Sequence, residues 1–137
     1  SSRLFAGNPV TVVNFWFTTC SPCVGELSDL DALNKSLSEK GGEVVGINSF
    51  TLDGDKTAIS EAKDVLTKKG ASYKNIWFES NSEAGKFPSG LYSYPTTYVV
   101  DKNGNIVGDP ITGAITGKKQ SEKLNELIDQ AIANSKG

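Results

Sequence analysis

The two cysteines of the chain, Cys20 and Cys23, are the residues best suited to chemistry. They lie in the stretch NFWFTTCSPCVGEL, residues 14–27, directly after a run of apolar residues. A pair with this spacing can be a structural disulfide, half of a metal site, or a redox centre that alternates between dithiol and disulfide. The chain contains no histidine, so it cannot complete an ordinary zinc site, which takes four ligands. No metal site is therefore predicted.

A disulfide between Cys20 and Cys23 is sterically allowed if both lie at the start of a helix, because side chains three positions apart share a helix face. As a staple it would stabilise the fold by only about 2 kcal/mol, since it closes a very short ring. A CxxC pair that follows a buried strand and opens a helix is a specific signal of a redox motif. The redox interpretation is therefore preferred to two incidental buried cysteines or a zinc site shared with another chain.

The thiols of the two cysteines are expected to differ in acidity, because they lie at different distances from the start of the predicted helix. Free N–H groups and the positive end of the helix dipole stabilise a thiolate, which lowers a cysteine pKa from roughly 8.5 to about 3.5–7.5. Cys20, nearer the helix start, is predicted to be the nucleophile, and Cys23 is predicted to resolve the mixed disulfide. Pro22 suits the first helical turn, where its missing N–H removes no intrahelical bond.

Glu26 follows Cys23 by three residues and falls about one helical turn further on, near the same face. A carboxylate held beside a buried thiol can accept the proton that the resolving cysteine must lose before it attacks. The other interpretation is an ordinary exposed helix glutamate. The residues alone support the two interpretations equally.

Length and charge set the class of protein. At 137 residues the chain is long enough for one domain with a single core, and residues 1–137 are predicted to form one domain. The net charge of −2 and the lack of a basic block argue against nucleic acid or an anionic membrane surface as a partner. The longest apolar runs are much shorter than the roughly 20 residues of a membrane-spanning helix.

The first half of the chain has the pattern strand, helix, strand, helix. Residues 10–17 form a continuous β-branched and aromatic run typical of a strand buried on both faces. Residues 24–40 repeat apolar side chains at helical spacing. A second buried strand is predicted at 43–50, followed by a helix from Asp55, its expected N-cap, to Gly70.

The second half of the chain is less regular, although Asn103-Gly104 suits a tight antiparallel hairpin. The predicted elements are a short strand at 75–79, a helical turn at 83–92, hairpin strands at 96–101 and 105–113, and a helix at 118–134. This order predicts an α/β fold with a central mixed β-sheet and helices on both faces. The sheet would contain a parallel βαβ unit followed by the antiparallel hairpin.

Three segments together resemble the thioredoxin superfamily, and more narrowly its bacterial TlpA/ResA-like extracytoplasmic thiol-disulfide oxidoreductases. The segments are VTVVNFWFTTCSPCVGEL, VVGINSF and YPTTYVVDKNGNIVG, and the resemblance covers most of residues 10–132. It implies a thioredoxin-like fold in which Cys20 and Cys23 are the catalytic redox pair and Glu26 is the acid beside them. It also implies that Pro95 is a cis proline facing the disulfide.

The resemblance further implies how the protein is used. The backbone of Tyr94, next to Pro95, would bind an extended substrate chain, and Pro22 between the cysteines would also contact substrate. The partners would be protein thiols and disulfides, and a membrane electron donor such as a transmembrane thiol reductase. No cofactor is implied other than the Cys20–Cys23 disulfide. The domain would act as a monomer in the periplasm or on the outer face of the cell membrane, tethered by an upstream segment.

Three positions depart from the family pattern. Asn14 stands where cytoplasmic thioredoxins carry a buried aspartate, which fits the extracytoplasmic branch. Thr19 replaces the usual tryptophan before the first cysteine, and Ser28 replaces a proline often found two residues after the glutamate. Because of these two replacements, the sequence does not determine the shape of the substrate-binding surface or whether the helix is kinked.

Two rival functions remain. A thiol peroxidase of the same superfamily would need a threonine three residues before its peroxidatic cysteine and an activating arginine. Phe17 holds that place here, and Arg3 is the only arginine. A protein-binding module with idle cysteines is the rival from another class, and the presence of both cysteines together with Glu26 argues against it.

Overall fold

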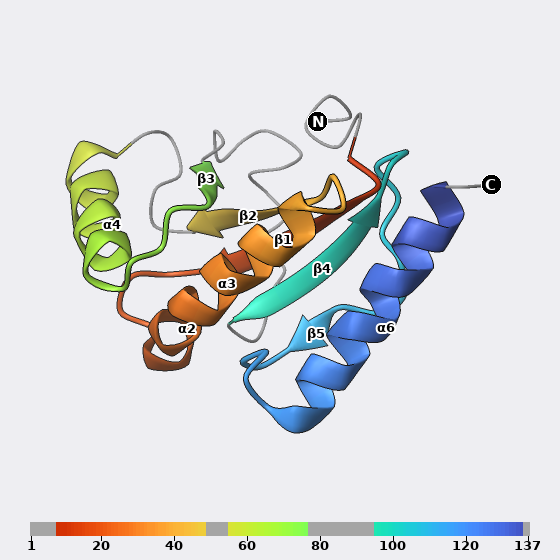
Figure 1. Ribbon diagram of the computed structural model, residues 1–137. Coiled ribbons are helices and arrows are strands. Elements are labelled where there is room, and N and C mark those ends of the chain that lie inside the picture. Colours follow the sequence, from red (N-terminus) through yellow and green to blue (C-terminus); the bar gives the residue numbers. More distant parts are fainter. Residues whose placement is uncertain (1–7, 49–54, 77–94, 136–137) are drawn as a thin grey trace.

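A computed structural model describes residues 8–48, 55–76 and 95–135 of the chain. These residues form a mixed sheet of five strands in the order β3-β2-β1-β4-β5, accompanied by helices (Figure 1). The predicted α/β class with a mixed sheet is therefore confirmed. In chain order the elements are β1 (Val10–Trp16), α2 (Ser21–Gly25), α3 (Leu27–Ser38), β2 (Glu43–Asn48), α4 (Lys56–Lys68), β3 (Lys74–Ile76), β4 (Thr96–Asp101), β5 (Ile111–Thr112) and α6 (Lys118–Ser135).

Strand β1 lies at the centre of the sheet. It runs parallel to β2 and antiparallel to β4, so the strand that leads to the cysteines is paired on both sides. All of its residues are buried, as its β-branched and aromatic composition predicts. The register places Asn14 of β1 between Gly46 of β2 and Thr97 of β4. The side chain of Asn14 therefore projects from the central strand of the sheet.

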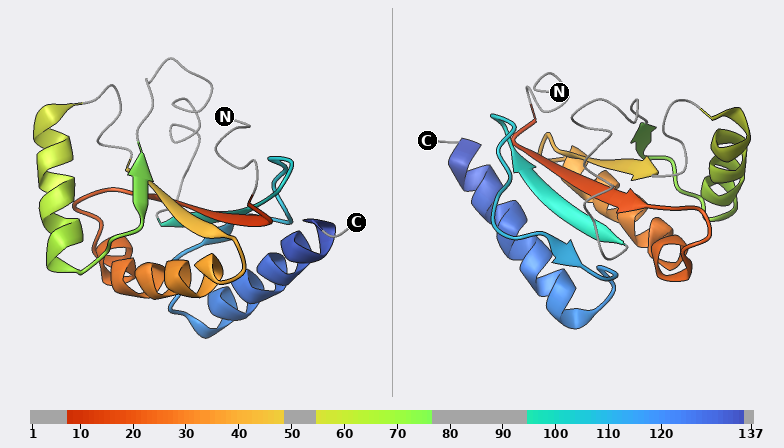
Figure 2. Two further views of the ribbon diagram at one scale, coloured as in Figure 1. Left: turned by 45° about the horizontal axis from the view of Figure 1, so that its top comes forward. Right: turned by 180° about the vertical axis from the view of Figure 1, so that it is seen from behind.

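Helices α3 and α6 lie on the same face of the sheet, and α4 stands beside the β3 edge (Figures 1 and 2). A smaller apolar cluster, which includes Phe15 and Ile47, lies on the opposite face. This cluster consists of strand residues among those described, so the expectation of a helix over the second face stays a prediction. The main core includes both cysteines, and its other buried members are Val10, Val12, Trp16, Leu27, Leu30, Leu37, Val44, Ala62, Tyr73, Val99, Val107, Ile111, Ile115, Leu124, Leu127, Ile128 and Ala131.

The helix predicted as one continuous segment over 24–40 is interrupted at Glu26, which separates α2 from α3. The Glu26 N–H donates to the Cys23 carbonyl at 3.2 Å, a tighter turn than that of a regular α-helix. Gly25 precedes this point, and glycine is a weak helix former. The chain therefore bends here without the proline that Ser28 replaces, and the kink that the sequence left open is present.

The other two predicted helices are confirmed. The Asp55 side chain accepts a hydrogen bond from the Ala58 N–H at 3.0 Å, so it caps α4 as expected. Helix α4 ends just before Gly70, whose φ of +68° is a left-handed conformation that favours glycine. Helix α6 covers the predicted range to within one residue.

The predicted antiparallel hairpin is present, but its second strand is shorter than expected. Val100 pairs with Ile106 in an isolated bridge, whereas strand β5 covers only two residues of the predicted 105–113. Gly108 has a φ of +68°, and Pro110 has no N–H to donate to a neighbouring strand. These two residues interrupt the ladder between the bridge and β5.

Three predicted elements extend beyond the described residues. Strand β2 covers residues 43–48 of the strand predicted at 43–50, and the last two residues of that segment lie outside the described ranges. Strand β3 includes the first two residues of the strand predicted at 75–79, and the rest of that segment lies outside the described ranges. The helical turn predicted at 83–92 lies wholly outside them. Among the helices that are described, none combines the length and apolar character needed to cross a membrane.

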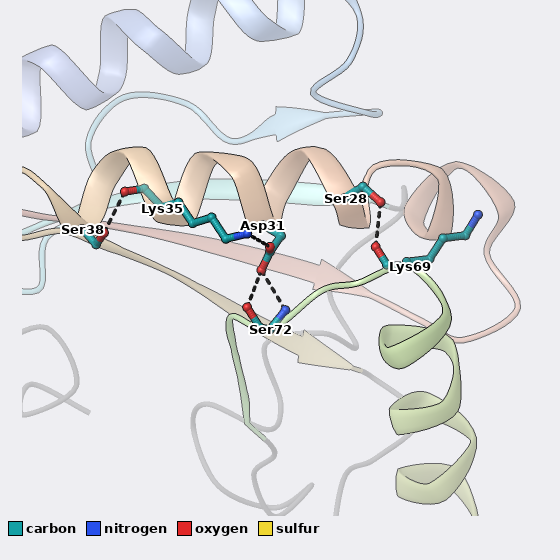
Figure 3. Close-up of polar contacts among 6 residues, drawn as sticks. All are labelled: Ser28, Asp31, Lys35, Ser38, Lys69 and Ser72. Atoms are coloured by element: carbon teal, nitrogen blue, oxygen red, sulfur yellow. Dashed lines mark hydrogen bonds and ion pairs between the residues drawn. The ribbon is translucent and has the colours of Figure 1, made fainter.

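Polar contacts fasten α3 to the connection between α4 and β3 (Figure 3). Asp31 Oδ1 accepts from the Ser72 N–H at 2.7 Å and from the Ser72 hydroxyl at 2.9 Å. Its Oδ2 lies 3.2 Å from Lys35 Nζ, one turn further along α3. Nearer the start of the helix, the Ser28 hydroxyl donates to the Lys69 carbonyl at 2.8 Å. These contacts fix the helix that follows the cysteines against the β3 side of the molecule.

Candidate active site

A disulfide joins Cys20 and Cys23, whose Cα atoms are 5.2 Å apart. Cys20 is the N-cap of α2, and its Sγ accepts a hydrogen bond from the Cys23 N–H at 3.4 Å. Pro22 lies in the first turn of α2, as predicted. The structure thus places both sulfurs at the start of the helix that follows β1.

The two cysteines differ in how much of their surface reaches solvent. Cys20 keeps 6% of its surface exposed, and Cys23 keeps none. The residues that flank Cys20, Thr19 and Ser21, are exposed, and so is Pro22. A partner molecule can therefore approach Cys20 from solvent, whereas Cys23 presents no surface to solvent.

Glu26 is fully buried, so the interpretation of it as an ordinary exposed helix residue is wrong. Its Oε1 accepts from Asn14 Nδ2 at 2.9 Å, and its Oε2 accepts from the Ile115 N–H at 2.7 Å. The interruption between α2 and α3 is at Glu26 itself. The side chain therefore points from this bend into the core, toward β1 and the segment between β5 and α6.

The environment of Glu26 favours its protonated form. Burial raises the pKa of this carboxyl above its ordinary value of 4.5, because a charge is poorly stabilised away from water. The hydrogen bonds from Ile115 and Asn14 oppose the rise, and the negative charge of Asp29 adds to it. A raised pKa makes the Glu26 carboxylate a stronger proton acceptor than an exposed glutamate.

Asn14 contacts Glu26, although nothing about its position in the sequence indicates this contact. Its Nδ2 donates to Glu26 Oε1 and also to Thr97 Oγ1 at 3.1 Å. Its Oδ1 is buried and has no hydrogen-bond partner. The available signal was an amide within a continuous apolar strand, because a buried polar side chain requires partners.

Pro95 is buried and immediately precedes β4. Its carbonyl accepts from the Gly113 N–H at 3.0 Å, which holds the start of β4 beside the end of β5. Tyr94 lies outside the described residues, and so does the peptide bond before Pro95 that was predicted to be cis. Both expectations for substrate binding at this point remain predictions.

The structure bears in part on two alternatives to a redox centre, namely a metal site and a thiol peroxidase. Within the described ranges, no three or more histidine, cysteine, aspartate or glutamate side chains gather in a way that could hold a metal ion. Phe17, which occupies the place of a peroxidase threonine, packs partly buried against the main core. Arg3 lies outside the described residues.

Comparison with known sequences places these features in a family. Residues 2–108 match the model of the AhpC/TSA family. The chain is 29% identical over 116 residues to the thiol-disulfide oxidoreductase ResA of Bacillus thuringiensis, covering 85% of this chain and 60% of that protein. It is 28% identical over 119 residues to the thiol:disulfide interchange protein HelX of Rhodobacter capsulatus, covering 87% and 61%. The chain thus spans about 60% of the length of these curated relatives.

Solved structures agree on the fold. A thiol:disulfide interchange protein of the thioredoxin family from Chlorobium tepidum superposes with a TM-score of 0.67 at 22% identity, over 96% of this chain and 85% of that one. The match to the family model extends from before β1 to beyond β4, so it contains both cysteines, Glu26 and Asn14. With a thioredoxin-like fold and a CxxC disulfide at the start of the helix after β1, the chain belongs to the AhpC/TSA family.

Proposed function

We propose that this domain is a thiol-disulfide oxidoreductase that reduces disulfides of protein substrates. The observation that carries the proposal is the Cys20–Cys23 disulfide at the start of α2, with Cys20 reachable from solvent and Cys23 buried. A structural staple of this ring size would add little stability. The names of ResA and HelX, as a thiol-disulfide oxidoreductase and a thiol:disulfide interchange protein, support the same activity.

In the first step the Cys20 thiolate attacks a substrate disulfide. A bond forms between Cys20 Sγ and one substrate sulfur, the substrate S–S bond breaks, and the other substrate sulfur leaves as a thiolate that takes a proton from solvent. The N–H of Cys23, which points at Cys20 Sγ at 3.4 Å in the disulfide form, is placed to stabilise the Cys20 thiolate. The first step therefore uses the more accessible of the two cysteines.

In the second step Cys23 resolves the mixed disulfide. Its thiol gives its proton to the Glu26 carboxylate, and the resulting thiolate attacks Cys20 Sγ, so the Cys20–Cys23 bond forms as the second substrate thiolate leaves. Two electrons have then passed from the domain to the substrate. A dithiol donor restores the reduced pair by the reverse exchange and itself becomes a disulfide, while Glu26 returns its proton.

The setting proposed for this chemistry is outside the cytoplasm, in the periplasm or at the outer face of the cell membrane. The partners would be extended segments of protein substrates, contacting Pro22 and the backbone of Tyr94 beside Pro95, and a membrane thiol reductase as electron donor. Exposure of Pro22 next to Cys20 supports a substrate contact at this place. The domain would act as a monomer and without any cofactor besides its own disulfide.

Trapping of the mixed disulfide tests the proposed roles of the cysteines. Reduced Cys23→Ser, treated with a disulfide-containing peptide, should accumulate an adduct through Cys20, because the resolving step is missing. Cys20→Ser is the matched control and should form little adduct, because its remaining thiol is buried. Mass spectrometry of the intact proteins measures both yields.

Two outcomes would contradict this assignment. Equal adduct yields from the two variants would mean that the helix start does not fix the roles. No adduct from either variant, together with failure of the unaltered protein to reduce insulin, would favour a binding module with idle cysteines. An insulin-reducing protein that loses activity in both variants supports the oxidoreductase.

A further inference from the structure

Asn14, Glu26 and Thr97 form a buried polar group that the proposed chemistry uses only in part. All three residues are inaccessible to solvent. They come from three separate elements, namely β1, the bend between α2 and α3, and β4. Asn14 Nδ2 bridges the other two, at 2.9 Å to Glu26 Oε1 and 3.1 Å to Thr97 Oγ1. A donor shared between two acceptors fits the carboxylate form of Glu26.

The other atom of the same amide is unpaired. Asn14 Oδ1 is buried and has no hydrogen-bond partner, and an unpaired buried acceptor is normally avoided in proteins. An asparagine amide keeps its shape when it rotates by half a turn, while its donor and acceptor exchange places. After such a rotation Oδ1 would lie between Glu26 and Thr97, where Nδ2 lies in the present structure.

The rotated arrangement fits the carboxylic acid form of Glu26. The acid has an O–H to donate, and a threonine hydroxyl can donate as well as accept. Asn14 Oδ1 could then accept from both, while Glu26 Oε2 still accepts from the Ile115 N–H. In the rotated arrangement Nδ2 would take the unpaired place that Oδ1 holds in the present structure.

We propose that Asn14 is a positioning residue for Glu26, donating to its carboxylate and, rotated by half a turn, accepting from its carboxylic acid. Glu26 can then gain and lose a proton without leaving its buried position. The inference rests on the proposed function, in which Glu26 takes the proton of Cys23. Asn14 touches neither the substrate nor the sulfurs in this role and acts only through Glu26.

Other groups also act on Glu26, and the test must leave them unchanged. Asp29 on α3 adds to the rise of the Glu26 pKa. Tyr73, just before β3, is close enough for the Glu26 charge to add to the effect of burial in raising the tyrosine pKa. A substitution at Asn14 alters neither of these side chains, so a change in the titration of Glu26 would report the amide itself.

The test is the titration of Glu26 in the oxidised protein, followed by NMR of 13C-labelled glutamate carboxyl groups and assigned with Glu26→Gln. In Asn14→Leu the carboxylate loses a donor and the carboxylic acid loses an acceptor. Because the hydrogen bond to the charged form is the stronger of the two, the midpoint should move upward by roughly one pH unit. The infrared C=O band of the protonated Glu26 should move to higher wavenumber, because its O–H loses an acceptor. The matched control is Asn48→Leu, which removes a buried asparagine that donates to Thr18 instead.

An unchanged midpoint and band in Asn14→Leu would overturn the inference, and so would equal shifts in the Asn48→Leu control. If Asn14→Leu does not fold, Asn14→Asp keeps the amide's shape. Its two facing carboxyl groups should then titrate in two widely separated steps, because they compete for one proton; a single step would overturn the inference. This titration involves no exchange reaction. Failure of Glu26 as the proton acceptor would instead appear as an unchanged pH dependence of exchange in Glu26→Gln.

Discussion

Glu26 and Asp31 are two buried carboxylates on neighbouring turns of the helical segment that follows the cysteines, yet their pKa values move in opposite directions. The exposed fraction is 0% for Glu26 and 4% for Asp31. The Glu26 pKa is raised and the Asp31 pKa is lowered. Burial alone therefore does not decide the charge of a side chain in this protein.

The difference lies in what surrounds each carboxylate. The backbone N–H of Ser72 contributes most to the lowered pKa of Asp31, and the Ser72 hydroxyl and Lys35 add to it (Figure 3). Glu26 accepts from two neutral donors, no cation among the described residues contributes to its pKa, and Asp29 places a second negative charge nearby. Asp31 is thus equipped to remain charged and fasten α3, whereas Glu26 is equipped to change its proton state, as acid–base chemistry requires.

The largest effect is expected from Glu26→Gln. Glutamine keeps the shape of glutamate but cannot accept the proton of Cys23, so resolution of the mixed disulfide should slow by about 100-fold at neutral pH. Rapid-quench mass spectrometry of the mixed disulfide measures this rate across pH. An unchanged pH–rate profile would show that the raised pKa of Glu26 has no part in exchange.

Asp31→Asn should instead lower stability and leave exchange nearly unaltered. The amide loses the charge that strengthens the contacts with Ser72 and Lys35, which should reduce the free energy of unfolding by about 1–3 kcal/mol. Urea unfolding at neutral pH measures the loss. Asp29→Asn, an exposed aspartate on the same helix, is the control and should change stability little. A comparable loss of stability in the control would mean that the loss in Asp31→Asn does not come from the contacts of Asp31 with Ser72 and Lys35.

The pH dependence of stability should separate the two carboxylates. Folded Asp31 binds its proton more weakly than unfolded Asp31, so its contribution is complete above its ordinary pKa of 3.8 and is lost as pH falls below it. Folded Glu26 binds its proton more tightly, so stability falls as pH rises from 4.5 through the raised pKa. Relative to the unaltered protein, Glu26→Gln should therefore gain stability with rising pH, and Asp31→Asn should regain it with falling pH. Parallel curves for the two variants would contradict the comparison.

A smaller effect is expected from Asp29→Asn on the titration of Glu26. Removing a nearby negative charge should lower the Glu26 midpoint by a few tenths of a pH unit, because Asp29 is exposed and water weakens its field. Carboxyl NMR measures the shift. It should shrink at high salt, and a salt-independent shift would point to a structural change rather than a lost charge.

The smallest effect is expected from Lys35→Ala. The Lys35 side chain is 74% exposed, so its ion pair with Asp31 should contribute no more than about 0.5 kcal/mol. Urea unfolding compares this variant with Asp31→Asn. A loss as large as that of Asp31→Asn would mean that the cation, and not Ser72, keeps Asp31 charged.

Several elements of the fold were predictable because their signals are local. The apolar run of β1, the cap of α4 at Asp55 and the stripe of α6 each lie within one short stretch of sequence. The bend at Glu26 was not predictable in the same way, since residues 24–40 have unbroken helical spacing. The short β5 was missed because the strand-like residues around Gly108 and Pro110 suggested a longer ladder than those two residues permit.

The sequence by itself determined that two cysteines stand at the start of a helix after a buried strand, with a carboxylate one turn further on. This follows from spacing and composition, which act over a few residues. Only the tertiary structure decided the state of that carboxylate. Its hydrogen-bond partners, Asn14 and Ile115, are 12 and 89 positions away in the chain. Their approach depends on the pairing of β1 with β4 and on the return of the chain from β5 to α6, which bury Glu26 and raise its pKa.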